Sequence, residues 1–99
     1  MSKKRLSAEY TMLAILEYMC IYARDTPISK YHILTKVKGL STQRPDRISR
    51  IMDTLERNGY IKSVKTPNAK FYQVTEKGLK VYYKWAKDFL EFVRSLKDV

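Results

Sequence analysis

The 99-residue chain lacks most of the patterns from which disulfides, metal centres and catalytic sites are built. It has one cysteine and one histidine, so an internal disulfide is impossible and no Cys/His metal-ligand spacing exists. Its three glycines form no phosphate-binding loop, and no paired carboxylate motif is present. These absences predict a protein that is not an enzyme and that holds no metal or cofactor.

The few side chains with reactive potential have structural interpretations. Cys20 lies in an apolar helical run, which favours a buried and inert thiol over a redox sensor. His32 has no nearby acidic residue placed to orient it, which favours a structural or exposed histidine over a ligand or base. Asp46 and Asp53 each neighbour arginines and are expected to pair with them along a helix.

Long hydrophobic runs are missing as well. No apolar stretch approaches the ~18 residues of a membrane-spanning helix. The basic start, MSKKR, is not followed by the uninterrupted apolar core of a signal peptide. With 44% apolar residues, the chain suits a small globular core. We therefore expect one cytoplasmic domain, residues 1–99, with no membrane partner.

Positive charge, in contrast, is abundant. Lys and Arg number 20 against 10 acidic residues, a net charge of +10. Residues 30–70 alone hold ten of the cations and three of the acids. Such an imbalance favours a polyanionic partner, with nucleic acid ahead of an anionic membrane surface. A basic protein that is merely kept soluble by its charge is the alternative.

Hydrophobic periodicity and the expected N-caps Ser7, Ser29 and Thr75 predict mainly helical structure with a small β-hairpin, an α+β fold. Residues 1–6 are expected to form a basic tail, and Pro27 to break the first helix before an extended start at Ile28. Residues 66–69, Thr-Pro-Asn-Ala, have the composition of a turn. The expected helices cover residues 7–24, 30–38, 44–58 and 76–96, and the expected strands of the hairpin cover 60–65 and 70–74.

The stretch 40–61 is the best defined of these elements. Pro45 suits a first helical turn, and Asn58-Gly59 suits a helix end. Arg47 and Arg50 are expected on the helix face opposite the apolar stripe. The positions expected to form that buried stripe are Ile48, Ile51, Met52 and Leu55.

Two helices are more apolar than one small domain requires. Between residues 10 and 23, only Thr11 and Glu17 are neither apolar nor aromatic, so a second surface, from another subunit or the C-terminal helix, is expected to cover this helix. The C-terminal helix, about 30 Å long, carries a coiled-coil-like seam and is expected to pack against its own copy. The expected dimer contacts are Met12, Ile15, Met19, Tyr22, Tyr82, Trp85, Phe89, Phe92, Val93 and Leu96.

In order and motif, the chain resembles the winged helix-turn-helix family over residues 8–92. Leu55, Gly59, Tyr60 and Ile61 are similar to the family's L…GLI junction. The segment YQVTEKG, residues 72–78, is similar to its Y-x-L-T-x-K-G motif. The resemblance is closest to small dimeric archaeal proteins of cells, plasmids or viruses. The acidic-then-arginine wing motif common in multiple-drug-resistance regulators is absent from residues 62–70.

The resemblance implies a recognition helix at 44–58, a wing at 62–70, a C-terminal dimerisation helix at 75–97 and a twofold-symmetric dimer. Arginine suits a recognition helix because its planar fork matches two acceptors on a guanine edge. Lysines of the preceding helix and of the wing would contact phosphates or the minor groove. The expected DNA contacts are Gln43, Arg44, Arg47, Ser49, Arg50, Lys30, Lys36, Lys38, Lys65 and Lys70.

Three functions fit these features. The first is a homodimeric repressor that binds a specific pseudo-palindromic duplex through two successive major grooves. The second is an architectural chromatin protein that binds DNA with little sequence preference. The third is a winged helix used for protein–protein contact. The sequence identifies no small-molecule effector, and its tyrosines lie at helical spacings that favour core and interface over base stacking.

Overall fold

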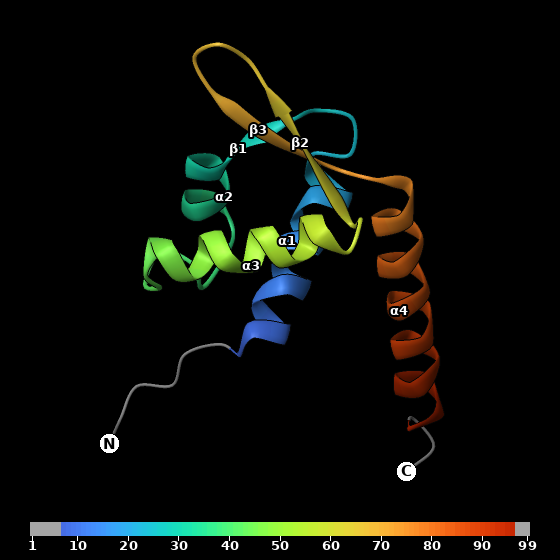
Figure 1. Cartoon of the computed structure of the whole chain (residues 1–99). Coiled ribbons are helices and arrows are strands. Elements are labelled where there is room, and N and C mark those ends of the chain that lie inside the picture. Colours follow the sequence, from blue (N-terminus) through green and yellow to red (C-terminus); the bar gives the residue numbers. More distant parts are fainter. Residues whose placement is uncertain (1–6, 97–99) are drawn as a thin grey trace, which may run out of the picture.

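The computed structural model describes residues 7–96 and forms four helices and a three-stranded sheet (Figure 1). The expected fold class is confirmed, and the basic tail 1–6 and residue 97 lie outside the described residues. The first two helices each end two residues earlier than expected. The elements are α1 Ala8–Tyr22, β1 Ile28–Ser29, α2 Lys30–Lys36, α3 Pro45–Arg57, β2 Ile61–Lys65, β3 Lys70–Val74 and α4 Glu76–Ser95.

Side-chain caps begin three of the helices at the predicted residues. The hydroxyl oxygens of Ser7, Ser29 and Thr75 accept hydrogen bonds from backbone N–H groups three residues ahead, at 3.0–3.1 Å. Helix α3 has no such side-chain bond: Arg44 occupies its cap position and Pro45 its first turn. The start of α3 at Pro45 places Gln43 outside the helix.

The sheet has the order β1-β3-β2, with both pairs antiparallel. The short extended segment at Ile28 pairs with Tyr72, so the predicted hairpin gains a third strand. At the far end of the hairpin, Lys65 lies directly opposite Lys70. The hairpin projects from the helical body as the wing (Figure 1).

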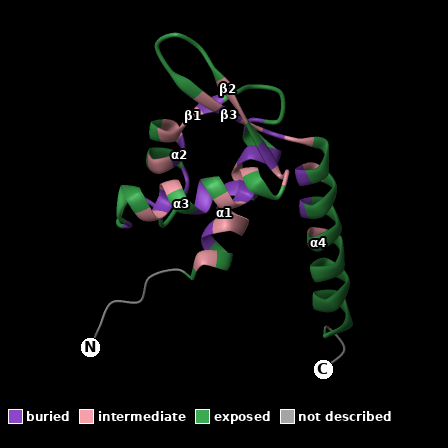
Figure 2. Ribbon diagram, viewed as in Figure 1, coloured by how far each residue is buried: buried purple, intermediate pink, exposed green. Residues whose placement is uncertain are grey.

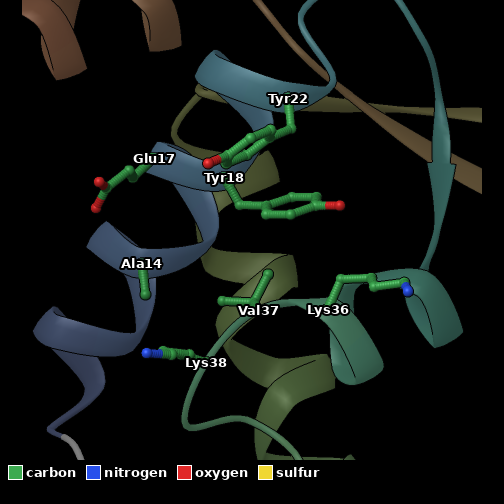
Figure 3. Close-up of a pocket in the computed structure, with 7 residues that line it drawn as sticks. All are labelled: Ala14, Glu17, Tyr18, Tyr22, Lys36, Val37 and Lys38. Carbon is green, nitrogen blue, oxygen red and sulfur yellow. The ribbon is translucent and has the colours of Figure 1, made fainter.

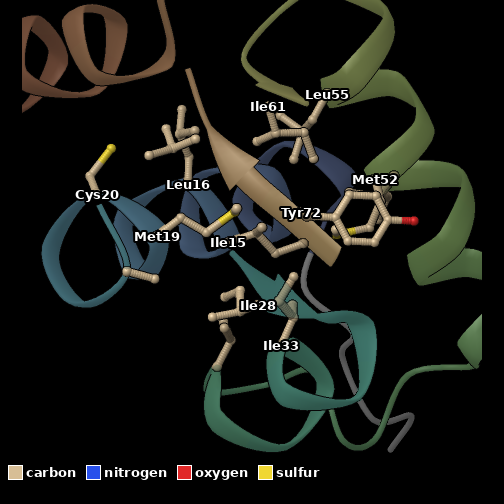
Figure 4. Packing of buried hydrophobic residues seen from close by; sticks show 14 of the residues in the cluster. Ile15, Leu16, Met19, Cys20, Ile28, Ile33, Met52, Leu55, Ile61 and Tyr72 are labelled. Atoms are coloured by element: carbon tan, nitrogen blue, oxygen red, sulfur yellow. The ribbon is translucent and has the colours of Figure 1, made fainter. Parts of the chain in front are cut away.

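The core lies between α1, α3 and the sheet (Figure 4). The predicted stripe of α3 is confirmed, since all four of its side chains are at most 5% exposed. Ile15 and Met19 of α1 are fully buried in this same core, and Tyr82 of α4 is 6% exposed. The expectation that these three residues contact a second subunit is therefore wrong. Most of the apolar side chains of α1 pack against α3, β3 and α4 of its own chain, while Tyr10, Ile21 and Tyr22 remain exposed.

Close backbone packing joins α3, the wing and α4. Gly59 has a φ of 81°, the left-handed conformation that ends α3. The Thr75 hydroxyl donates to the Gly59 carbonyl at 2.5 Å. A Cβ atom at Gly78 would collide with the carbonyl oxygen of Tyr60 and lie 2.9 Å from Val74 Cγ2. Residues of both family-like motifs thus meet at one junction, and this junction fixes the direction of α4 relative to α3.

Candidate nucleic-acid interface

The outward face of α3 carries alternating charges. At about 100° per residue, positions 46, 50, 53 and 57 fall opposite the buried stripe. All four side chains, two aspartates and two arginines, are exposed. Arg44, at the cap position, is also exposed and lies 3.4 Å from Asp46, Nε to Oδ1. An ion pair so open to water contributes little to stability, so Arg44 is available to a ligand.

Arg47 lies to one side of this face rather than on it. Its side chain is half-buried and donates to Gln43 Oε1. Gln43 itself is 5% exposed, and its amide nitrogen donates to Thr11 Oγ1 at 3.2 Å and to the Gly39 carbonyl at 3.0 Å. The expectation that Gln43 contacts DNA is therefore wrong, because this buried amide ties the loop before α3 to α1. This buried role of Gln43 depends on a tertiary contact with Thr11, and no pattern in the neighbouring sequence predicts it.

Two of the expected contacts are brought together at the start of α2. Lys30 Nζ donates to Ser49 Oγ at 2.7 Å, and both residues are half-buried. The bond holds the first turn of α2 against α3 and positions the ammonium beside the recognition-helix candidate. A lysine has further donors, so Lys30 can bind a phosphate while it retains this bond.

Lys36 and Lys38 occupy a different place from Lys30. They line a concavity of about 390 Å³ together with side chains of α1, among them Glu17, Tyr18 and Tyr22 (Figure 3). The rings of Tyr18 and Tyr22 lie 5.1 Å apart, centroid to centroid, and the Tyr18 hydroxyl lies 2.8 Å from His32 Nε2. His32 is therefore a half-buried structural histidine that links α2 to α1.

The wing presents positive charge without any acidic residue. Lys62, Lys65 and Lys70 are all exposed. Lys65 and Lys70 are cross-strand neighbours, an arrangement that repels in water. Lys70 Nζ also lies 5.3 Å from the centre of the Tyr72 ring, a cation–π distance. The wing tip therefore holds two lysines at directly opposite positions of its strands, whose charges a polyanion would neutralise.

The charge is distributed unevenly over this surface. From 44 to 57, α3 and its cap hold four arginines and three acids, a difference of one. Residues 30–38 and 62–70 hold three lysines each and no acid. The excess positive charge of the region therefore belongs to residues 30–38 and to the wing, while α3 itself is nearly neutral and varied in its polar groups.

The outward positions Asp46, Asp53 and Arg57, and Lys62 in the wing, were not among the expected contacts. The signal for the first three is the 4-3-4 spacing with Arg50, which shares a helix face as surely as the apolar stripe does. Because two of the four residues on this face are aspartates, the positions of the arginines alone do not reveal the face. Lys62 carries no signal apart from its place in the wing.

Helix α4 extends an apolar surface away from the domain. Every residue from 87 to 96 is exposed (Figure 2). Trp85 and Phe89 stack with centroids 5.4 Å apart and ring planes 7° apart, while both remain more than 40% exposed. Of the other expected dimer contacts, Phe92, Val93, Leu96 and Tyr22 are exposed, and Met12 is half-buried against the core. An apolar groove of about 390 Å³ lies where Ile21 of α1 faces α4.

Two groups at the α1–α4 contact have displaced acidities. Burial raises the pKa of the Cys20 thiol to about 11, against a smaller opposing effect of Arg24. Burial, then Glu17, raises the pKa of Tyr82. Cys20 is thus a protonated, inert core residue at neutral pH. Within residues 7–96, no cluster of His, Cys, Asp and Glu could hold a metal, and no helix is long and apolar enough to cross a membrane.

No family model and no curated protein sequence matches the chain. Several solved structures are similar to it. MepR, a transcription regulator of the Staphylococcus aureus multidrug efflux pump MepA, aligns with a TM-score of 0.71 and 21% identity, over 87% of this chain. The chain spans 61% of the length of MepR. A transcriptional regulator from Clostridium thermocellum gives 0.67 and 21%, over 91% of this chain and 89% of that one.

A PadR family transcription regulator from Clostridium difficile gives a TM-score of 0.66 at 16% identity, over 90% of this chain and 95% of its own. All three alignments include most of the described helices and sheet, at identities where likeness establishes fold alone. Together with the helix order, the β1-β3-β2 sheet and the projecting hairpin, they show that the chain has the winged helix-turn-helix fold.

Proposed function

We propose that the protein is a sequence-specific transcription regulator that binds double-stranded DNA as a cytoplasmic homodimer and represses by occupying its site. The observation that supports this most is the outward face of α3: exposed arginines on a helix whose back is fixed by the core, with Lys30 of α2 beside it and further lysines in the wing. A rigid helix with a varied polar face can discriminate bases, and lysines at its flanks can bind phosphates.

In this proposal Arg50 enters the major groove from the middle of the outward face, and Arg44 reaches base edges or phosphate at its start. Arg47, held by Gln43, contacts the backbone with Ser49 and Lys30 beside it. The remaining lysines, Lys36, Lys38, Lys65 and Lys70, serve phosphates.

The homodimer is supported by the exposed end of α4. A ten-residue helical end in water is marginal without tertiary packing. A stacked Trp85–Phe89 pair on such an end indicates a surface that another apolar surface covers. A second copy presents the same surface, and twofold pairing of α4 would space two α3 helices for successive major grooves about 34 Å apart. The acidic-arginine wing motif of multiple-drug-resistance regulators is missing from residues 62–70, which counts against that subfamily; the resemblance to small archaeal, plasmid or viral winged-helix proteins belongs to this proposal.

An architectural role, with little sequence preference, is the second candidate. The six lysines that flank α3 favour it, since phosphate contacts alone supply non-specific affinity. The three acidic residues on α3 disfavour it, because each repels phosphate.

Competition binding separates these functions. Duplexes selected from a random pool should outcompete random duplex by ~10³ or more for a regulator. Arg50→Ala should weaken the selected complex by about tenfold or more and the random complex less. Lys80→Ala, on the opposite side of α4 from the apolar surface, is the control for removal of one positive charge. Equal affinity for every duplex would favour the architectural role, and no duplex binding at low salt would favour a protein-interaction module.

A further inference from the structure

Asp53 is an unpaired carboxylate at the centre of the candidate DNA-reading face. The other two acids of α3 have partners: Asp46 lies beside Arg44, and Glu56 Oε2 accepts from Ser63 Oγ at 2.6 Å. Asp53 is exposed and makes no hydrogen bond or ion pair with any described residue. Arg50 and Arg57 lie one helical turn to either side, yet neither pairs with it. Pairing along the helix, the ordinary structural use of such an aspartate, is therefore absent.

A carboxylate in this place is unfavourable for binding that depends on phosphates alone. It repels the DNA backbone and reduces the positive charge of the face. It is useful where it meets a hydrogen-bond donor in the major groove. Among base edges, the exocyclic N4 amino group of cytosine is the donor that aspartate recognises. Adenine also has an amino group, but its neighbouring N7 is an acceptor, which would face the second carboxylate oxygen.

The spacing between Asp53 and Arg50 fits the spacing of bases. Three residues advance a helix by about 4.5 Å, close to the 3.4 Å rise between base pairs of one strand. Arg50 donates two hydrogen bonds to acceptors, as on guanine, and Asp53 accepts one from a donor, as on cytosine. The two side chains can therefore read the same or adjacent base pairs with opposite polarity.

We propose that Asp53 is a specificity-determining residue that accepts a hydrogen bond from the N4 amino group of a cytosine beside the guanine read by Arg50. This rests on the proposed function of α3 as a reading helix. Asp53 also excludes guanine and thymine at its position, because their O6 and O4 atoms would face a carboxylate acceptor to acceptor. The residue thus costs affinity for random DNA and adds preference for one base.

The test is selection of bound duplexes from a random pool by the full chain and by Asp53→Ala and Asp53→Asn, followed by titration of the selected duplex. The wild type should select a motif with cytosine at one position of each half-site. Asp53→Ala should lose that preference alone, bind the selected duplex about tenfold or more weakly, and bind random duplex at least as tightly. Asp53→Asn should shift the same position toward adenine, which asparagine recognises through N6 and N7.

Asp88→Ala is the matched control, since it removes one exposed aspartate from α4, where Asp88 pairs with Lys84 at 3.0 Å. It should leave every preference unchanged. A wild-type motif that Asp53→Ala also selects unchanged, with tighter binding to all duplexes, would overturn the role of Asp53 and leave the regulator intact. A wild type that selects no motif would overturn the regulator and the Asp53 assignment together. Since Asp53 is exposed and unpaired, neither variant should lower the thermal midpoint, and Asp53→Ala should raise it slightly because alanine has the higher helix propensity.

Discussion

Helices α3 and α4 are both amphipathic, but they complete their apolar faces in different ways. In α3 every residue of the stripe is buried inside the chain, and the exposed residues, apart from Pro45, are charged. In α4 only the first part packs on α1, around Tyr82, and the apolar side chains beyond Ala86 face water (Figure 2). The apolar face of α3 is therefore fully buried by its own domain, whereas much of the apolar face of α4 is not.

This difference suits the two helices to different kinds of partner. A helix whose back is fully fixed presents a rigid polar face, which suits hydrogen-bonded recognition of base edges. A helix with exposed aromatic side chains suits burial against another apolar surface. Asp53 on α3 and Phe89 on α4 illustrate the contrast. The exposed carboxylate suits a hydrogen-bond donor, whereas the exposed aromatic ring suits another apolar surface.

Phe89→Asp should have the largest effect, on both the dimer and the affinity for DNA. A charge placed in an apolar dimer contact should separate the protomers, and the affinity for a two-half-site duplex should fall by about 100-fold or more, since linked half-sites add avidity on that scale. The domain should remain folded because Phe89 is 48% exposed in the single chain. Light scattering gives the mass, and titration of the selected duplex gives the affinity.

Lys80→Asp is the control for this change. Lys80 is exposed on the polar side of the same helix, so the variant changes charge even more but leaves the apolar surface intact. It should remain a dimer. A monomeric wild type, or a Phe89→Asp variant that stays dimeric, would remove α4 as the dimer contact and leave its exposed aromatic residues without a partner.

Gly78→Ala tests the junction that joins the two helices. The added Cβ would overlap the Tyr60 carbonyl oxygen, which belongs to backbone that cannot move without shifting α3 or the wing. The free energy of unfolding should fall by about 1–3 kcal/mol, the usual cost of overpacking. Urea unfolding measures it, with Ala86→Gly for comparison, which lowers helix propensity and removes one partly packed methyl group without any overlap. An unchanged midpoint would show that α4 is free to pivot on the domain.

The features that depend on local sequence were predictable. The caps at Ser7, Ser29 and Thr75, the helix end at Gly59 and the apolar stripe of α3 all follow from neighbouring residues, and the structure confirms each one. The order of elements and the hairpin follow in the same way, because periodicity and turn residues are local signals.

The errors share a tertiary cause. The composition of the first helix shows that apolar surface covers it, but not whether that surface belongs to the same chain or to a second subunit. This is why Ile15 and Met19 were expected at a dimer contact. Gln43 was expected on DNA, although a buried hydrogen bond to Thr11, 32 residues earlier, uses its amide. The extended segment at Ile28 was predicted correctly, but its pairing with Tyr72 as a third strand depends on a distant partner and was not. Side-chain roles set by long-range contacts are beyond sequence patterns.

The smallest expected effect is that of Lys65→Gln, which distinguishes the role of the wing in DNA binding from that of α3. Lys65→Gln removes one member of the Lys65–Lys70 cross-strand pair, so the free energy of unfolding should rise by a few tenths of a kcal/mol. The same change should weaken selected and random duplexes equally and lower the slope of log affinity against log salt by about one per protomer. The two effects have opposite signs, which a purely structural role for Lys65 would not produce.

Lys62→Gln is the matched variant, because Lys62 lies opposite Gln73 and has no like-charged neighbour across the strand. It should weaken DNA binding in the same uniform way with no gain in stability. Loss of preference at a base position with either variant would mean that the wing reads sequence. In that case the division between flanking lysines that bind phosphate and an α3 face that reads bases would fail, and specificity would have to be shared between the two elements.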